Sequence, residues 1–311
     1  MEPPTTIPLV ILAGRDRSSE RPDRAGYHDL GGFKAIETQI EGKPLIQVAV
    51  ERFRATGLFD PIVIAGPAKI YEQLGLQERL IDTDKTFGAN LGAAVETLIT
   101  ECAPPQIAIT TSDIVPETED LERVLGDYRA HLPLEWWMAL HRVDDPDQLR
   151  SSAYKPRYRI VPHGEREPAA VLPGHLVIVN AMAARRRLIY KIFDLAYASR
   201  GKSVAYRRVY IVRRAIITLL GADLRRIFRG QTPVITASLL WHGFRLANAL
   251  RRGDVEIGEM EDMARTMWAT RQHRRRFPDL RGRFAVLPCR SLARDVDTEE
   301  EAMELTQKGT L

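Results

Sequence analysis

The stretch PLVILAGRDR (residues 8–17) decides the fold. Its four consecutive apolar residues, 9–12, are typical of a strand buried in a protein core. Ala13 and Gly14 follow at once, and residues 15–33 are mostly charged, polar or glycine. A glycine turn after a first strand, with such a loop behind it, indicates an α/β protein that binds a ligand at the end of that strand.

The alternation of strand and helix continues along the chain. Runs typical of strands lie at residues 61–66, 106–115, 136–143 and 175–181, and runs with helical spacing lie at residues 44–57 and 88–102. This order predicts a Rossmann-like, mostly parallel mixed sheet flanked by helices. Gly14, Gly66 and Asp113 fall at strand ends, where sheets of this kind bind their ligands.

Composition limits the class of protein. The 311 residues are 44% apolar and 28% charged with a net charge of +4, which is ordinary for a globular protein. Two cysteines, Cys102 and Cys289, are too few for a disulfide framework. The start MEPPTTIP lacks the features of a signal peptide, and no apolar run approaches a membrane span of about 20 residues. We expect a cytoplasmic protein.

The carboxyl-terminal third differs in composition and pattern. Residues from about 181 to 275 read as a helical insertion, and between Arg185 and Arg229 the only acids are Asp194 and Asp223 among many cations. A closing strand and helix are predicted within 283–305. We therefore expect one domain, 1–311, that contains this basic insertion.

The residues after the first strand are suited to binding an anion. Small residues let backbone N–H groups approach a phosphate, and nearby cations neutralise its charge. Neither G-x-x-x-x-G-K-[ST] nor G-x-G-x-x-G follows the strand, which excludes two common phosphate loops. What remains is the tripeptide 12–14 followed by Arg15, Arg17 and Lys34. A solvated loop whose cations face water is the alternative.

Five segments in order resemble the MobA-like nucleotidyltransferases of the sugar-phosphate nucleotidyltransferase superfamily. They are LVILAG with a later Lys34 and IEGKPLIQ, PIVIAGP, GANLGAAVETL, AITTSDIVPETEDLERVL and ARDVDTEEEAMEL. The resemblance covers residues 7–143 and 283–305 and implies a GT-A-like form of the fold. It implies transfer of NMP from an NTP to a phosphorylated sugar, polyol or lipid, with release of pyrophosphate.

The resemblance also implies roles for individual residues. The cations that act in catalysis would be Arg15, Arg17 and Lys34, the nucleotide-binding residues Leu12, Ala13, Gly14, Gly66 and Asn90, and the ligands of a Mg²⁺ cofactor Asp113 and Asp297. Two features depart from the family. Arg15 stands where a second glycine is usual, and the loop to Lys34 is longer.

The carboxylates have structural alternatives. Asp113 ends an apolar strand, where a carboxylate is costly unless it is paired or binds metal, but it can also cap the next helix. Asp295 is a lesser candidate beside Asp297. Thr298 with Glu301 forms a capping-box pattern for a final helix, which is compatible with a metal role for Asp297.

Two other polar residues are open to a structural reading. Asn90 contacts a base or ribose if Gly88 and Gly92 give a ligand room, or it simply begins a helix. His175 stands alone in PGHLVIVN and is interpreted as structural.

Two rival functions belong to other classes. One is a glycosyltransferase of GT-A-like fold with DVD (295–297) as its metal motif, although this motif lies at the extreme carboxyl end. The other is a non-catalytic nucleotide-fold protein that docks on a membrane or partner through its basic helices. Those helices either contact an anionic membrane, which suits a lipid-linked acceptor, or present a solvated face. Few aromatic residues and no recognised motif exclude nucleic acid.

Overall fold

The computed structural model describes residues 6–15, 33–144, 157–198, 204–228, 230, 235–296, 301–303 and 305. Within these residues the main sheet has nine strands in the order β10-β8-β9-β6-β1-β4-β5, and β7 joins β9 to β11. The strands are β1 (Ile7–Leu12), β4 (Phe59–Gly66), β5 (Arg79–Asp82), β6 (Ile107–Thr111), β7 (Leu134–Arg142), β8 (Tyr158–Val161), β9 (Ala169–Val179), β10 (Val255–Glu256) and β11 (Arg281–Leu287). A separate hairpin pairs β2 (Gln39–Ile40) with β3 (Lys43–Pro44).

The sheet is mixed and mostly parallel, as the sequence predicts. β6, β1, β4 and β5 are parallel neighbours, and β7 is parallel to β11. β9 runs antiparallel to β6, β7 and β8 and so joins the two parallel parts. The predicted strands at 61–66, 106–115, 136–143 and 175–181 are confirmed by β4, β6, β7 and β9. The short strands β5, β8 and β10 were not predicted, because runs this short carry little periodicity.

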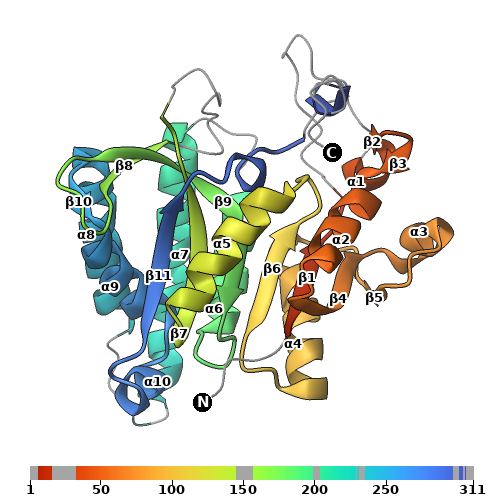
Figure 1. The fold of residues 1–311 in the computed structure, drawn as a ribbon. Coiled ribbons are helices and arrows are strands. Elements are labelled where there is room, and N and C mark those ends of the chain that lie inside the picture. Colours follow the sequence, from red (N-terminus) through yellow and green to blue (C-terminus); the bar gives the residue numbers. More distant parts are fainter. Residues whose placement is uncertain are drawn as a thin grey trace.

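Helices cover both faces of the sheet (Figure 1). They are α1 (Lys34–Glu37), α2 (Leu45–Ala55), α3 (Ala68–Tyr71), α4 (Phe87–Cys102), α5 (Thr118–Ala130), α6 (Arg186–Ala198), α7 (Val204–Ile227), α8 (Ile235–Arg252), α9 (Ile257–Trp268) and α10 (Arg271–Arg276). Alternate residues of β1 face opposite layers: Leu9 and Ile11 join the core with α2 and α5, while Val10 and Leu12 join the core with α4. The first strand is thus buried on both faces, as its unbroken apolar run requires.

The basic segment packs on α4 through specific contacts rather than leaving all its cations in water. Arg186 Nε donates to Glu96 at 2.7 Å, and the Tyr190 hydroxyl donates to the same carboxylate at 3.1 Å. A Cβ on Gly88 would lie 1.9 Å from the Tyr190 carbonyl oxygen. Gly88 and Gly92 therefore leave room for α6. The prediction that these glycines make room for a ligand was wrong.

No helix in the described ranges has both the length and the apolar character needed to cross a bilayer. Cys102 is exposed and Cys289 is buried, and both are free thiols.

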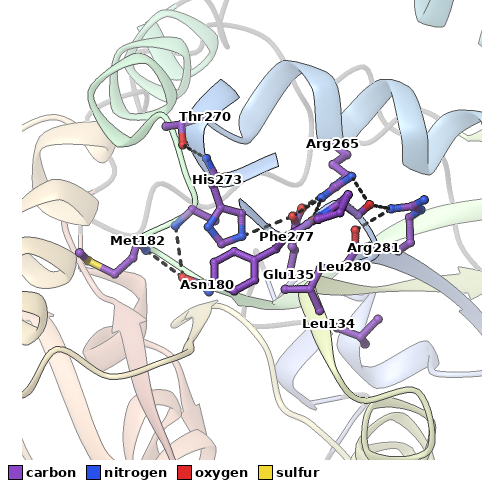
Figure 2. Close-up of polar contacts among 12 residues, drawn as sticks. Leu134, Glu135, Asn180, Met182, Arg265, Thr270, His273, Phe277, Leu280 and Arg281 are labelled. Atoms are coloured by element: carbon purple, nitrogen blue, oxygen red, sulfur yellow. Dashed lines mark hydrogen bonds and ion pairs between the residues drawn. The ribbon is translucent and has the colours of Figure 1, made fainter. Parts of the chain in front are cut away.

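A buried carboxylate fastens the insertion to the sheet (Figure 2). Glu135, at the start of β7, is fully buried and accepts two hydrogen bonds from Arg265 of α9, at 2.9 and 2.7 Å. Arg265 also donates to the carbonyl oxygens of Phe277 (2.6 Å) and Pro278 (3.3 Å). Burial lowers the pKa of the neighbouring His273, whose Nε2 lies 3.4 Å from the Glu135 carboxylate. One side chain thus joins α9, the segment before β11, and β7.

We predict that Arg265→Met lowers the free energy of unfolding by about 3–5 kcal/mol, because the Glu135 carboxylate is left buried without its partner. Urea denaturation measures the change. The double variant Glu135→Leu/Arg265→Met removes both charges and should recover most of the loss. Arg245→Met is the control: it breaks a half-exposed pair with Glu259 and should cost no more than about 1 kcal/mol. A loss of equal size in the control would contradict the role of burial.

Candidate active site

A cavity of about 370 Å³ lies at the carboxyl ends of β1 and β6. Its polar lining comes from elements that are distant in sequence: the turn after β1, the start of α1, the loop before α4, the end of β6, β9 and the segment after β11. Polar and charged side chains that line it are Arg15, Lys34, Lys85, Asn90, Thr111, Ser112, Asp113, His175, Tyr197 and Asp295. The site therefore lies at the edge of the sheet where parallel strands end, as predicted.

Most predicted site residues that the structure describes meet in this cavity. Leu12, Gly14, Arg15, Lys34, Asn90 and Asp113 all line it. Ala13 and Gly66 lie behind it, where a Cβ on Gly66 would be 2.6 Å from the Ala13 carbonyl oxygen. That oxygen accepts a hydrogen bond of 2.6 Å from the buried Tyr71 hydroxyl, whose pKa burial raises. Gly66 thus serves close packing of β4 against the first turn. Arg17 and Asp297 lie outside the described residues.

The Asn90 side chain packs against the turn that contains Gly14. Its Oδ1 accepts hydrogen bonds from the Thr83 hydroxyl at 2.7 Å and from the Lys85 N–H at 2.9 Å. Its Nδ2 is so close to Gly14 that a Cβ there would lie 2.5 Å away. Thr86 is the N-cap of α4, so Asn90 lies within the first turn instead of capping the helix. The side chain thus ties the loop before α4 to the glycine turn.

Three cations line the cavity. Arg15 lies over the Phe33 ring, 6.0 Å from its centroid, and Lys34 begins α1. The third, Lys85, was missed because it precedes the quoted GANLGAAVETL motif and carries no signal of its own. Three positive side chains around one cavity favour a polyanionic ligand.

Two carboxylates and a histidine line the same cavity. His175 Nε2 is hydrogen-bonded to a carboxylate oxygen of Asp295, and its Nδ1 lies 2.7 Å from the Thr111 hydroxyl and 3.9 Å from an Asp113 oxygen. The Thr111 hydroxyl in turn donates to Asp113. His175, interpreted from the sequence as structural, therefore lies in the cavity and links the two acids. Because β9 is antiparallel to β6, His175 sits across from the β6 end, and this pairing is not visible in the sequence.

Backbone hydrogen bonds bring the closing segment to Asp113. The Val296 N–H donates to the Asp113 carbonyl oxygen at 2.7 Å. Ser291 donates from its N–H (2.9 Å) and its hydroxyl (2.7 Å) to the buried Asp120 of α5. The Cys289 N–H donates to His141 Nδ1 at 3.1 Å, and burial lowers the pKa of this histidine, so it stays a neutral acceptor. These bonds hold the segment that bears Asp295 against the cavity.

The acid pair fits a hard divalent cation. Asp113 is not a helix cap, because Glu117 occupies the N-cap of α5. No cluster of three or more His, Cys, Asp and Glu side chains arranged to hold a metal occurs in the described part of the chain. Mg²⁺ needs no such cluster, since it is typically held by one or two carboxylates together with waters and substrate phosphates. Asp113 and Asp295 are two carboxylates that line the cavity.

Comparison with known proteins identifies the fold. No protein-family model and no curated protein matches the sequence. Among solved structures, the chain is similar to a hypothetical transferase from Thermus thermophilus, with a TM-score of 0.54 and 18% identity over 96% of this chain and 99% of that chain. The chain therefore has the α/β Rossmann-like fold of that transferase.

Two further structures are less similar. A 4-diphosphocytidyl-2C-methyl-D-erythritol synthase from Anaerococcus prevotii gives a TM-score of 0.47 at 8% identity, covering 99% of each chain. A CMP:2-keto-3-deoxy-manno-octonic acid synthetase in complex with CTP gives 0.42 at 14% identity, covering 63% of this chain and 86% of that one. Similarity at this level carries no conclusion about activity.

We predict that Gly14→Ala weakens the binding of inorganic tripolyphosphate about tenfold, a loss of about 1.4 kcal/mol, because the new methyl group displaces Asn90 from the loop that carries Lys85. Isothermal titration calorimetry measures the affinity. Gly126→Ala is the control, because nothing lies within 4 Å of a Cβ at that helical position. Unchanged affinity in Gly14→Ala would show that the turn does not position the cations.

Proposed function

We propose that the protein is a Mg²⁺-dependent nucleotidyltransferase, related to the MobA-like enzymes, that transfers NMP from an NTP to a phosphorylated acceptor and releases pyrophosphate. One observation carries this proposal: cations and a linked pair of carboxylates line the same cavity at the strand ends. A phosphoryl group in transfer needs both, since catalysis of this kind is mainly positioning and charge neutralisation.

The cations would bind the triphosphate. Arg15, Lys34 and Lys85 approach the cavity from three separate segments, so they can contact different phosphates of one chain. As pyrophosphate leaves, negative charge grows on the β- and γ-phosphates, and fixed cations stabilise that charge without reorganising. In the resembled family a second glycine in this turn lets backbone N–H groups approach the phosphates. Arg15 stands at that position here, and its charge would take over part of this neutralisation.

The carboxylates would hold the metal. Among the described residues, Asp113 and Asp295 would be the ligands, and hydrogen bonds from His175 and Thr111 would orient them. Bound Mg²⁺ would neutralise phosphate charge and polarise the reacting phosphorus centre.

The transfer itself needs no general base. An oxygen of the acceptor phosphate attacks the α-phosphorus, a new P–O bond forms, and the bond between the α-phosphorus and the bridging oxygen to the β-phosphate breaks. A phosphomonoester has a second pKa near 6, so the attacking oxygen is already ionised at neutral pH. The chain's task is to align the two anions, and the cations that line the cavity offset their repulsion.

The rival functions make different demands on the same cavity. A glycosyltransferase would use Asp295 as part of a D-x-D motif and consume a nucleotide sugar, releasing no pyrophosphate. A non-catalytic protein would bind a nucleotide without turnover. Pyrophosphate release therefore identifies the nucleotidyltransferase, and turnover of a nucleotide sugar then separates the glycosyltransferase from a non-catalytic protein.

We predict that at least one of ATP, GTP, CTP and UTP binds at millimolar concentration or below, and that EDTA weakens this binding. Isothermal titration calorimetry with and without Mg²⁺ tests it. Pyrophosphate release with each NTP against phosphorylated sugars, polyols and lipids then tests the reaction. Absence of binding by all four nucleotides would remove the enzyme proposal. Turnover of a nucleotide sugar instead would favour the glycosyltransferase.

We predict that Asp113→Asn lowers turnover at least about 100-fold while the melting temperature barely changes. The substitution keeps the shape of a partly exposed side chain but removes the charge that would hold Mg²⁺. Asp120→Asn is the matched control, since Asp120 is buried and binds Ser291, so it should lower stability more than specific activity. An Asp113→Asn protein that unfolds but keeps its specific activity would make Asp113 a structural residue.

A further inference from the structure

A second, strongly apolar cavity adjoins the candidate active site. It has a volume of about 470 Å³ and lies between the sheet and helices α6 and α9. Both cavities are lined by Leu12, Phe87, Thr111, Gly174, His175 and Phe193, so they meet at the ends of β1 and β6. A molecule can therefore occupy both at once.

The floor of this cavity is one row of residues across the sheet. Ile109 of β6 pairs with Val177 of β9, Val177 with Met138 of β7, and Met138 with Phe284 of β11. All four side chains are half-buried and line the cavity. Central strands covered by helices normally bury such residues completely, so this part of the sheet is left open.

Along this one face of the sheet, the side chains change from polar to apolar. On β9, His175 lies in the polar site while Val177 and Val179 line the apolar cavity; on β6, Thr111 lies in the polar site and Ile109 behind it. Successive residues on one face of a strand are two positions apart. The polar head of a ligand held by His175, Thr111 and their neighbours would thus continue directly into apolar surroundings.

The walls are apolar as well. Ile189, Tyr190 and Phe193 of α6 and Ala264 and Trp268 of α9 face the cavity. These helices are held in place by the pairs Arg186–Glu96 and Arg265–Glu135, so the space is bounded by fixed elements.

This lining selects the kind of ligand. A nucleobase carries several hydrogen-bonding groups, and burying them is unfavourable wherever the lining offers no partner. Apart from Thr110, Thr111, His175, Arg186 and the polar atoms of Tyr190 and the two tryptophans, the lining here is apolar. A hydrocarbon chain loses nothing and removes apolar surface from water. Pockets of this size and lining are typical sites for small apolar ligands.

We propose that the phosphorylated acceptor is an amphiphile: a phosphomonoester of a long aliphatic alcohol, with its phosphate in the polar cavity and its chain in the apolar one. This inference rests on the proposed function for the phosphate end, and on the second cavity for the chain. It narrows the acceptor from sugars, polyols and lipids to the aliphatic class.

Calorimetry with a series of n-alkyl phosphates, from ethyl to decyl and below their micelle concentrations, tests the chain site without any nucleotide. Each added methylene should tighten binding about three- to fourfold until the cavity is filled. Ala264→Phe, which fills the cavity from α9, should abolish this dependence on chain length. Val177→Thr places a hydroxyl on the cavity floor and should reduce it, which covers the case in which the larger substitution does not fold. Ala247→Phe, at an exposed position of α8, is the matched control and should leave it unchanged.

A separate experiment tests whether the alkyl chain belongs to a membrane lipid or to a soluble acceptor. Exposed apolar side chains lie on α7 (Leu224, 53% exposed), directly after it (Phe228, 81%) and on α8 (Trp241, 59%; Phe244, 65%). Phosphatidylcholine vesicles that contain phosphatidic acid, compared with octyl phosphate in solution, distinguish a membrane lipid from a soluble acceptor. Two results together would overturn the cavity site: co-sedimentation that salt reverses, and no gain in affinity for the soluble series beyond butyl phosphate. They would place the alkyl chain of the acceptor in the membrane.

The two proposals fail in different ways. If affinity is independent of chain length while Mg²⁺–NTP binds and short acceptors release pyrophosphate, the amphiphile inference is wrong and the nucleotidyltransferase stands. If long chains bind in the cavity and no NTP binds, the transferase proposal is wrong while the chain site stands.

Discussion

The buried carboxylate of Glu135 constrains how the helical insertion meets the sheet. A fully buried carboxylate is tolerated only when charged partners and hydrogen bonds replace its water, and Arg265 provides both. Because Arg265 projects from α9 and also binds the chain before β11, these elements have one relative position in which the charge is compensated. That position sets the distance between α9 and the sheet, and with it the apolar cavity.

β9 has the second decisive role, because it joins the two parallel parts of the sheet with reversed direction. In a purely parallel sheet a strand beside β6 would bring its own carboxyl end to the site. The reversed strand instead places His175, with six residues of β9 before it and four after it, opposite Thr111 at the end of β6. The closing segment returns to the same point through Val296 and Asp113, so three distant segments share one group of acids.

The sequence predicted the parts of the fold and site that depend on local pattern. Apolar runs ending in glycine located β1 and β4, the apolar run before Asp113 located β6, and the family resemblance singled out Lys34 and Asp113, which line the cavity. Residues whose role depends on pairing were ranked low. His175, which the register of β9 brings to the site, was interpreted as structural, and Asp295, which backbone bonds of the closing segment bring in, was a lesser candidate beside Asp297. The glycines of α4 were misread for the same reason, since their neighbour Tyr190 lies about a hundred residues away in sequence. A contact between distant segments leaves no local periodicity to detect.

The open part of the sheet is best understood through its energetic cost. Half-exposed Met138, Val177 and Phe284 each forgo part of the stabilisation that complete burial gives an apolar side chain, about 25 cal/mol for every Å² left uncovered. A larger residue than Ala264 on α9 would fill the space and recover it. Proteins that keep such a space commonly do so where a ligand fills it, and natural sequences depart from optimal packing mainly at functional sites. The cavity directly adjoins the polar cavity, which both cations and acids line. Along one face of β6 and β9 the side chains change from polar to apolar. This change sets the direction of a bound amphiphile, with its charged end toward Asp113 and its alkyl chain toward Phe284.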